Sequence, residues 1–191
     1  MPLTFRPLIA ALAFSLALAG AAPAQEIGAD FSLPATDGRR LDPEALRGKP
    51  YLLFFGFTHC PEICPMALSE IALRLDELGL EGDRLTPIFV TVDPARDTLA
   101  HLRDYLGWFD PRLIGLSGSA AETEAIARSF RATYRKVPTE GGDYTMDHSA
   151  AIYLIDGAGE FFGHIDYRDP PESQLAALRA LLAAEKDNHH D

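Results

Sequence analysis

Residues 51–65 read YLLFFGFTHCPEICP and carry the strongest signal of the fold class. Its first part, YLLFFGF, is continuously apolar, which predicts a strand buried on both faces of its sheet. A Cys-x-x-x-Cys motif follows at Cys60 and Cys64, and Pro65 is suited to the first position of a helix. Cys64 then stands where an N-cap is expected, so the helix dipole and the free backbone N–H groups favour its thiolate.

Strand and helix patterns alternate on both sides of this stretch. A turn signal at 36–38 predicts a short N-terminal hairpin over 31–41. The remaining patterns predict strands over 85–92, 114–116, 150–155 and 160–165, and helices over 65–80, 97–106, 120–130 and 171–184. This order predicts an α/β fold with a central mixed sheet and helices on both faces. A strand, a Cys motif that opens a helix, and a late hairpin before a closing helix together indicate the thioredoxin-like plan.

The composition is that of one globular domain with an acidic surface. The chain has 191 residues, of which 47% are hydrophobic and 24% charged, values typical of a folded protein. Its formal net charge of −11 repels phosphate backbones, so we exclude nucleic acid as a partner.

The N-terminal residues have the composition of a signal peptide or of a membrane anchor. No charge lies between Pro7 and Gln25, and the small residues around Pro23 predict cleavage after Ala24. The apolar run is shorter than the ~20 residues of a membrane span, and membrane anchoring by residues 7–25 is the alternative. Either interpretation predicts export to the periplasm, as a soluble or an inner-membrane-anchored protein. The predicted divisions are a signal peptide or anchor over 1–24, a linker over 25–30, a thioredoxin-like domain over 31–186 and a polar tail over 187–191.

The two cysteines of the chain lie four residues apart, which favours a chemical over a structural role. A disulfide across so small a loop constrains the unfolded chain little. Redox thioredoxins use Cys-x-x-Cys, and the extra residue here lets two sulfurs diverge around an ion without forbidding a disulfide. Two thiolates are soft ligands that suit Cu(I), so metal binding and disulfide exchange both stay open on spacing alone.

One of the six histidines is placed to complete a metal site. His189 and His190 are interpreted as solvated tail residues, His101 as a surface residue of a polar helix and His164 as a strand residue. His59 adjoins Cys60, and its short tether would strain a shared ion. His148 precedes the strand over 150–155, and in a thioredoxin plan this loop faces the Cys motif. Thioredoxins have a substrate-guiding proline there, whereas this chain offers an imidazole. We therefore predict His148 as the third ligand.

Three segments together resemble the Sco/SenC family of thioredoxin-like copper chaperones that serve cytochrome c oxidase assembly. They read FGFTHCPEICP at 55–65, TVDPARDT at 91–98 and YTMDHSAAIYLID at 144–156. The segments occur in order and span most of the predicted domain, which makes the resemblance far more specific than the Cys spacing.

The resemblance implies that Cys60, Cys64 and His148 bind one Cu(I) or Cu(II) ion. It further implies delivery of copper to the dinuclear copper centre of cytochrome c oxidase, with a copper donor protein and the copper-receiving oxidase subunit as partners. The resemblance also implies an alternative, in which the protein acts as a thiol-disulfide oxidoreductase on the cysteines of that centre, as some relatives do. In that alternative, Cys60 and Cys64 are catalytic and a thiol reductant is a partner. A copper sensor with the same site is a third hypothesis.

Four further residues are considered for supporting roles. Asp93 either tunes the thiols or forms a turn with Pro94, and the structural role is favoured. Asp147 is a candidate to accept a hydrogen bond from His148. Trp108 and Phe109 are interpreted as packed residues rather than as a docking patch.

Overall fold

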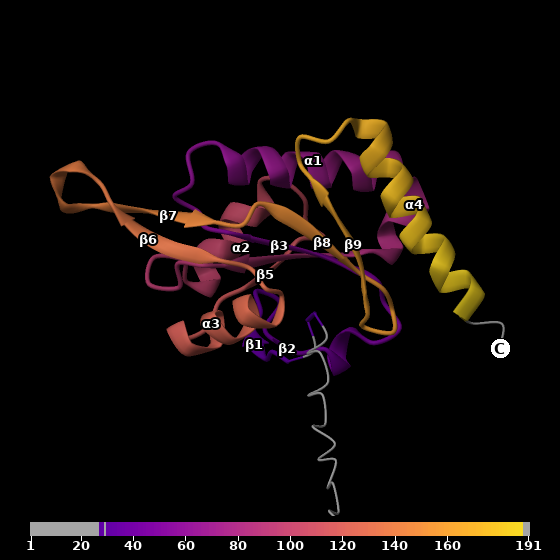
Figure 1. The fold of residues 1–191 in the computed structure, drawn as a ribbon, viewed down its shortest axis with the longest axis horizontal. Helices are drawn as coiled ribbons and strands as arrows, with labels where there is room; N and C mark the ends of the chain where they lie inside the picture. The colour runs from indigo at the N-terminus through magenta and orange to yellow at the C-terminus, as the bar shows by residue number, and fades with distance from the viewer. Residues whose placement is uncertain (1–26, 29, 189–191) are drawn as a thin grey trace, which may run out of the picture.

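The central sheet has five strands in the order β5-β4-β3-β8-β9 (Figure 1). The protein is represented by a computed structural model, which describes residues 27–28 and 30–188. The predicted signal peptide or anchor, and the histidines of the tail, lie outside the described residues. The strands of the sheet are β3 (Tyr51–Gly56), β4 (Thr86–Thr91), β5 (Ile114–Leu116), β8 (Ala151–Ile155) and β9 (Phe161–Asp166). The first three run parallel, while β8 and β9 pair antiparallel, so the predicted mixed sheet is confirmed.

Four helices flank this sheet, and they lie on both of its faces (Figure 1). They are α1 (Ile63–Glu77), α2 (Leu99–Gly107), α3 (Ala120–Ser129) and α4 (Pro171–Asn188). Phe55 contacts Phe130, the C-cap residue that follows α3, with ring centroids 5.8 Å apart. Gly56, the next residue along β3, faces the opposite side and lies against Cys64 of α1. Adjacent residues of one strand thus contact helices on opposite faces, which gives the predicted thioredoxin-like arrangement.

The N-terminal hairpin is also present, as β1 (Leu33–Pro34) and β2 (Arg40–Leu41) in antiparallel register. Its Ala35 bridges to Leu116 of β5, so the hairpin lies along that end of the sheet. Short 3₁₀ helices cover Glu44–Leu46, Gly79–Arg84 and Glu140–Gly142.

The sequence patterns did not predict the second hairpin, β6 (Tyr134–Pro138) with β7 (Tyr144–His148). It projects from the body of the domain and forms its own two-stranded sheet (Figure 1). Gly141 and Gly142 at its tip have φ angles of 80° and 85°, a region that glycine adopts without steric cost. Its second strand ends at His148, so the hairpin is the element that carries this side chain.

Several helix boundaries differ from their predictions, among them the end of α1, which lies at Glu77 rather than at 80. Helix α1 begins at Ile63, so Cys64 lies inside the first turn and is not the N-cap. Helix α2 is capped by Thr98, whose hydroxyl accepts from the His101 N–H, while Asp97 has a different role. Helix α4 continues to Asn188 rather than ending at 184. Within the described part of the chain, no helix is long and apolar enough to cross a membrane.

Candidate metal centre

The two cysteines lie at the carboxyl end of β3, where the loop turns into α1. Cys64 is fully buried, whereas Cys60 is half-buried. The backbone N–H of Cys64 points at Cys60 Sγ, with a donor–acceptor distance of 3.4 Å. The sulfur at the start of the helix is therefore that of Cys60, and the prediction that Cys64 benefits from this position is wrong. The reason is the helix start at Ile63, which moves Cys64 into the first turn and its side chain into the core.

This asymmetry sets the ionisation of the pair. The hydrogen bond from the Cys64 thiol is the main reason why the pKa of Cys60 is lowered to about 3. Burial raises this pKa, whereas hydrogen bonds from His148 and from the N–H groups of Cys64 and Glu62 lower it further. The same hydrogen bond, together with burial, raises the pKa of the Cys64 thiol. In the metal-free protein, Cys60 is thus the thiolate and Cys64 is the thiol that supports it.

His148 completes the group from the far side of the cleft. Its Nε2 atom lies 3.5 Å from Cys64 Sγ. Its Nδ1 atom donates to the Ser149 carbonyl oxygen at 2.9 Å, which fixes the ring with Nε2 facing the sulfur. The ring also packs edge-on against Phe54 and Phe57, with centroids 6.1 and 5.9 Å away. The imidazole is therefore oriented before any ion arrives.

The three donor atoms fit one metal ion. All of them lie within 4.8 Å of one another. With metal–sulfur and metal–nitrogen bonds of about 2.3 and 2.0 Å, tetrahedral to trigonal angles require a nitrogen–sulfur separation of about 3.5–3.7 Å. The observed 3.5 Å falls at the edge of that range. The structure thus brings together the three residues selected from the sequence, in a geometry that requires little movement.

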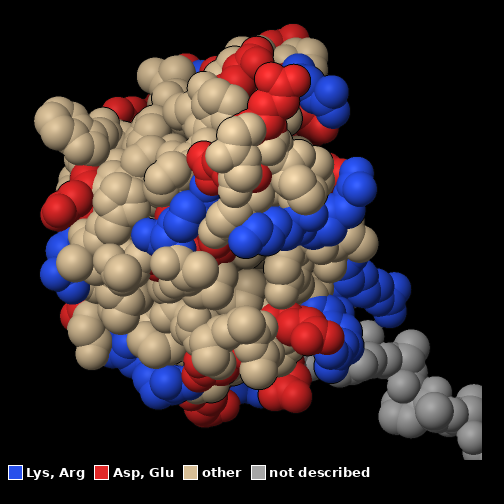
Figure 2. Space-filling model, turned by 90° about the vertical axis from the view of Figure 1, so that its left-hand side faces the viewer, with Lys and Arg blue, Asp and Glu red and all other residues tan. Residues whose placement is uncertain are grey.

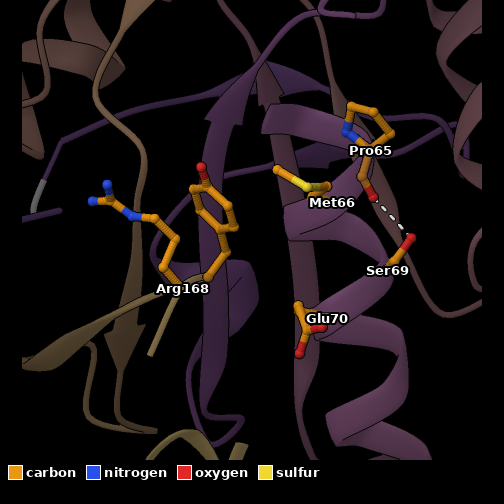
Figure 3. Close-up of a pocket in the computed structure, with 6 residues that line it drawn as sticks. Pro65, Met66, Ser69, Glu70 and Arg168 are labelled. Atoms are coloured by element: carbon orange, nitrogen blue, oxygen red, sulfur yellow. Dashed lines mark hydrogen bonds between the residues drawn. The ribbon is translucent and has the colours of Figure 1, made fainter. Parts of the chain in front are cut away.

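A small cleft leads to these residues, and a larger cavity lies beside them. The cleft has a volume of about 220 Å³ and is lined by the Cys loop and by residues 145–148 of β7. The cavity, of about 520 Å³, lies between the start of α1 and Tyr167 (Figure 3). Met66 and Arg168 face it, and Ser69 donates to the Pro65 carbonyl at its wall. Because neither cysteine nor histidine lines the larger cavity, the metal centre belongs to the smaller cleft.

Asp97 is a site residue whose role the sequence patterns did not reveal. Its carboxylate is fully buried and accepts three hydrogen bonds. Oδ2 accepts from the Thr58 N–H at 3.0 Å and from the Thr91 hydroxyl at 2.6 Å. Oδ1 accepts from the Thr58 hydroxyl at 2.6 Å. Asp97 therefore ties the start of the Cys loop to the end of β4, which fixes the approach to Cys60.

Asp93 fixes the β6–β7 hairpin in a comparable way. Its Oδ1 accepts from the Tyr144 hydroxyl at 3.0 Å, and its other oxygen pairs with Arg96. Arg96 in turn donates to the Tyr144 carbonyl at 3.1 Å. The side chains of Arg96 and Lys136 both lie over the Tyr144 ring, 3.8 and 3.4 Å from its centroid. The Asp93 carbonyl forms the predicted turn by accepting from the N–H groups of Arg96 and Asp97. Its side chain has the further role of holding the strand that carries His148.

The other candidates for supporting roles differ from their predictions in part. The carboxylate of Asp147 pairs with Arg135 at 2.8 Å instead of reaching His148, because adjacent strand residues point to opposite faces. Phe109 packs on Tyr105, as predicted, with centroids 5.2 Å apart. Trp108 is 87% exposed, so its interpretation as a packed residue is wrong.

The end of the molecule that carries the hairpin has charged side chains of both signs (Figure 2). Figure 2 looks at this end and shows basic side chains across the middle of the face, with acidic ones above and below. On the hairpin, Arg135 pairs with Asp147, and beside it Arg96 pairs with Asp93 and Asp143.

The fold and this site define a class of protein. The mixed sheet has two thiols at the start of a flanking helix and an imidazole that faces them. These features define a thioredoxin-like protein with three side chains grouped as metal ligands. The chain belongs to the SCO1/SenC family, whose family model matches residues 19–183.

Three comparisons illustrate the similarity. The mitochondrial SCO1 homolog 1 of Arabidopsis thaliana is 45% identical over 130 residues, which are 68% of this chain and 39% of that protein. The copper-bound structure of ScoI from Bradyrhizobium japonicum is 45% identical, covers 81% of this chain and 99% of its own, and superposes with a TM-score of 0.75. The copper-bound structure of ScoI from Arabidopsis thaliana is 37% identical, covers 83% and 99%, and has a TM-score of 0.77.

Proposed function

We propose that this protein binds one copper ion through Cys60, Cys64 and His148. The observation that carries the proposal is the Nε2 atom of His148, held 3.5 Å from the Cys64 sulfur by the hydrogen bond at Nδ1. Two soft thiolates and one imidazole favour Cu(I) over harder ions. Two similar proteins have been solved with copper bound, which supports the same cargo here.

We propose further that the copper is delivered to the dinuclear centre of cytochrome c oxidase. The half-buried Cys60 offers an incoming ligand a way to the ion, because its sulfur lines the open cleft. A copper donor protein and the copper-receiving oxidase subunit are the partners that this role requires. The chain spans 39% of the length of its Arabidopsis relative, and membership of the SCO1/SenC family is the support for this role.

Export is the third part of the proposal. Residues 1–24 have the composition of a signal peptide or an anchor, which supports a periplasmic location. The N-terminal sequence of the protein isolated from a periplasmic fraction tests it: a start at Gln25 means cleavage, and an intact N-terminus in the membrane fraction means anchoring. Recovery from the cytoplasm alone would contradict export.

Thiol-disulfide exchange is the second candidate function, and one observation favours it. Cys60 is accessible and has a lowered pKa, while Cys64 is buried and lies within 4.8 Å of it. An accessible thiolate attacks and a buried partner resolves the mixed disulfide in dithiol exchange. In that role the protein reduces the cysteines of the copper centre and is itself restored by a thiol reductant.

An anaerobic Cu(I) titration against a coloured chelator tests the copper proposal. The reduced wild-type protein should hold one ion tightly, and His148→Ala should weaken binding by about 100-fold or more, since loss of even an outer hydrogen-bond partner costs about 10–100-fold. His164→Ala is the matched control, because it removes an imidazole from β9. Equal Cu(I) affinity of His148→Ala and the control would refute the three-ligand site and favour the dithiol function.

A further inference from the structure

A second group of donor atoms lies beside the Cys loop, on residues that the metal centre does not use. His59 precedes Cys60, but its ring turns away from the sulfurs and meets His101 from the first turn of α2. The two ring centroids are 6.2 Å apart. His59 Nδ1 and His101 Nε2 lie 3.1 and 3.0 Å from the same atom, the hydroxyl oxygen of Thr58. Two imidazoles from distant parts of the chain thus converge on one point.

A buried carboxylate lies behind this point. Asp97 Oδ1 is 4.0 Å from His59 Nδ1, and the donor atoms of His59, His101 and Asp97 all lie within 4.8 Å of one another. The three hydrogen bonds to Asp97 come from neutral groups of Thr58 and Thr91. Among the described residues, no lysine or arginine lies within 4.0 Å of this carboxylate. A buried carboxylate without a lysine or arginine partner favours a cation at its open side.

The burial pattern makes the group accessible from one side only. Both histidines are exposed, with 51% exposure for the His59 side chain, whereas Asp97 is fully buried. Each exposed ring can exchange its hydrogen bond with the Thr58 hydroxyl for a bond to an ion, while the carboxylate is held in place. Bond lengths of about 2.0–2.2 Å to nitrogen and oxygen bring donors to about 3–4 Å from one another. Donors that already lie within 4.8 Å reach this spacing through small side-chain rotations.

We propose that His59, His101 and Asp97 form a second metal site, which takes a divalent transition ion such as Cu(II). Two imidazoles and a carboxylate are borderline and hard ligands, which suit Cu(II) or Zn(II) and disfavour Cu(I). Among these ions Cu(II) is bound most tightly by a given set of nitrogen and oxygen ligands. The site shares no ligand with the Cys-Cys-His group, so it stands whether or not that group carries copper.

Testing the site requires a protein whose other strong Cu(II) ligands have been removed. The background variant carries Cys60→Ser, Cys64→Ser and His148→Gln in the full chain. His189→Gln and His190→Gln are included so that the tail imidazoles do not contribute. Circular dichroism confirms the fold, and Cys64→Ala replaces the serine if the buried hydroxyl disturbs it. Cu(II) is then titrated at pH 7.5 and followed by calorimetry and by electron paramagnetic resonance.

The background variant should bind one Cu(II) ion with nitrogen hyperfine structure from imidazole. His59→Gln and His101→Gln should each weaken it by about 10-fold or more, by comparison with the 10–100-fold cost of removing a supporting contact. His164→Gln, on β9, is the matched control and should leave binding unchanged. Absence of a bound equivalent in the background, or equal binding in all three variants, would overturn the proposal.

A second measurement is independent of the histidine variants. Substoichiometric Cu(II) added to the isotope-labelled background variant should broaden the amide signals of residues 58–59 and 98–101 before those of β9. Broadening centred elsewhere would place the ion away from these histidines and overturn the assignment.

Discussion

Replacing Asp97 with asparagine tests how the fold holds the metal loop. The substitution keeps the shape of the side chain but removes its charge and turns one acceptor oxygen into an NH₂ donor. In the native protein, three donors from Thr58 and Thr91 point at this fully buried carboxylate. At one of the two oxygens a hydrogen bond must then reverse or be lost, and the remaining bonds lose their charged acceptor.

The expected change in the free energy of unfolding has two parts, the weakened hydrogen bonds and the lower cost of burying a neutral side chain. A hydrogen bond to a charged group contributes about 1.5–3 kcal/mol and a neutral one about 0.5–1.5 kcal/mol, so three such bonds lose about 3 kcal/mol together. Removing a buried charge relieves part of its desolvation cost, and we expect a net loss of about 2 kcal/mol for Asp97→Asn. With a slope of about 2 kcal/mol per molar, the urea midpoint falls by about 1 M.

Urea unfolding of the reduced, metal-free protein measures this change, with Asp147→Asn as the matched control. Asp147 makes an exposed pair with Arg135, and such pairs contribute only about 0–1 kcal/mol. If Asp97→Asn were as stable as this control or as the wild type, desolvation would outweigh the hydrogen bonds. The view of Asp97 as the anchor of the Cys loop would then be refuted.

Three further predictions concern the same region. Gly56→Ala should lower the free energy of unfolding in urea by about 1–3 kcal/mol, the usual cost of overpacking, because the new Cβ would lie 2.8 Å from Cys64 Sγ. Unchanged stability would contradict the close packing. Tyr144→Leu should weaken Cu(I) binding by about 10-fold in the chelator competition, since it removes a supporting contact of the hairpin and no ligand; wild-type affinity would mean that the hairpin needs no such support. In the metal-free protein, iodoacetamide should modify Cys60 much faster than Cys64 and keep most of its rate from pH 8 down to pH 6, because a lowered pKa keeps Cys60 ionised there. A rate that falls about 10-fold per pH unit below pH 8, read by mass spectrometry, would indicate an ordinary thiol.

The central sheet and its helices were predictable because their signals are local. The apolar run of β3 and the apolar spacing of α1 each lie within one element, and the structure has both close to the predicted ranges. The start of α1 was less predictable. Pro65 is suited to the first helical position, but the helix begins two residues earlier at Ile63, which places Cys64 in the core.

The β6–β7 hairpin was missed for a physical reason. Its first strand has only half-buried and exposed positions, which do not alternate regularly, so the strand carries no strong apolar period. The available signal was the Gly141-Gly142 pair between two short runs rich in tyrosine, valine and threonine. The structure nevertheless places His148 opposite the Cys motif, as expected, because that argument depended on the strand after it and not on the hairpin before it.

The contacts around the metal centre explain why residues 93–98 belong to it without providing a ligand to the Cys-Cys-His group. This loop leaves β4 and enters α2, and it touches both elements that carry the three donors. Asp97 holds Thr58 at the start of the Cys loop, while Asp93 and Arg96 hold Tyr144 at the start of β7. The cysteines and the histidine are more than eighty residues apart in the chain. Their relative position therefore depends on one loop that is bonded to both sides, and a change in this loop moves the sulfur and nitrogen donors relative to each other.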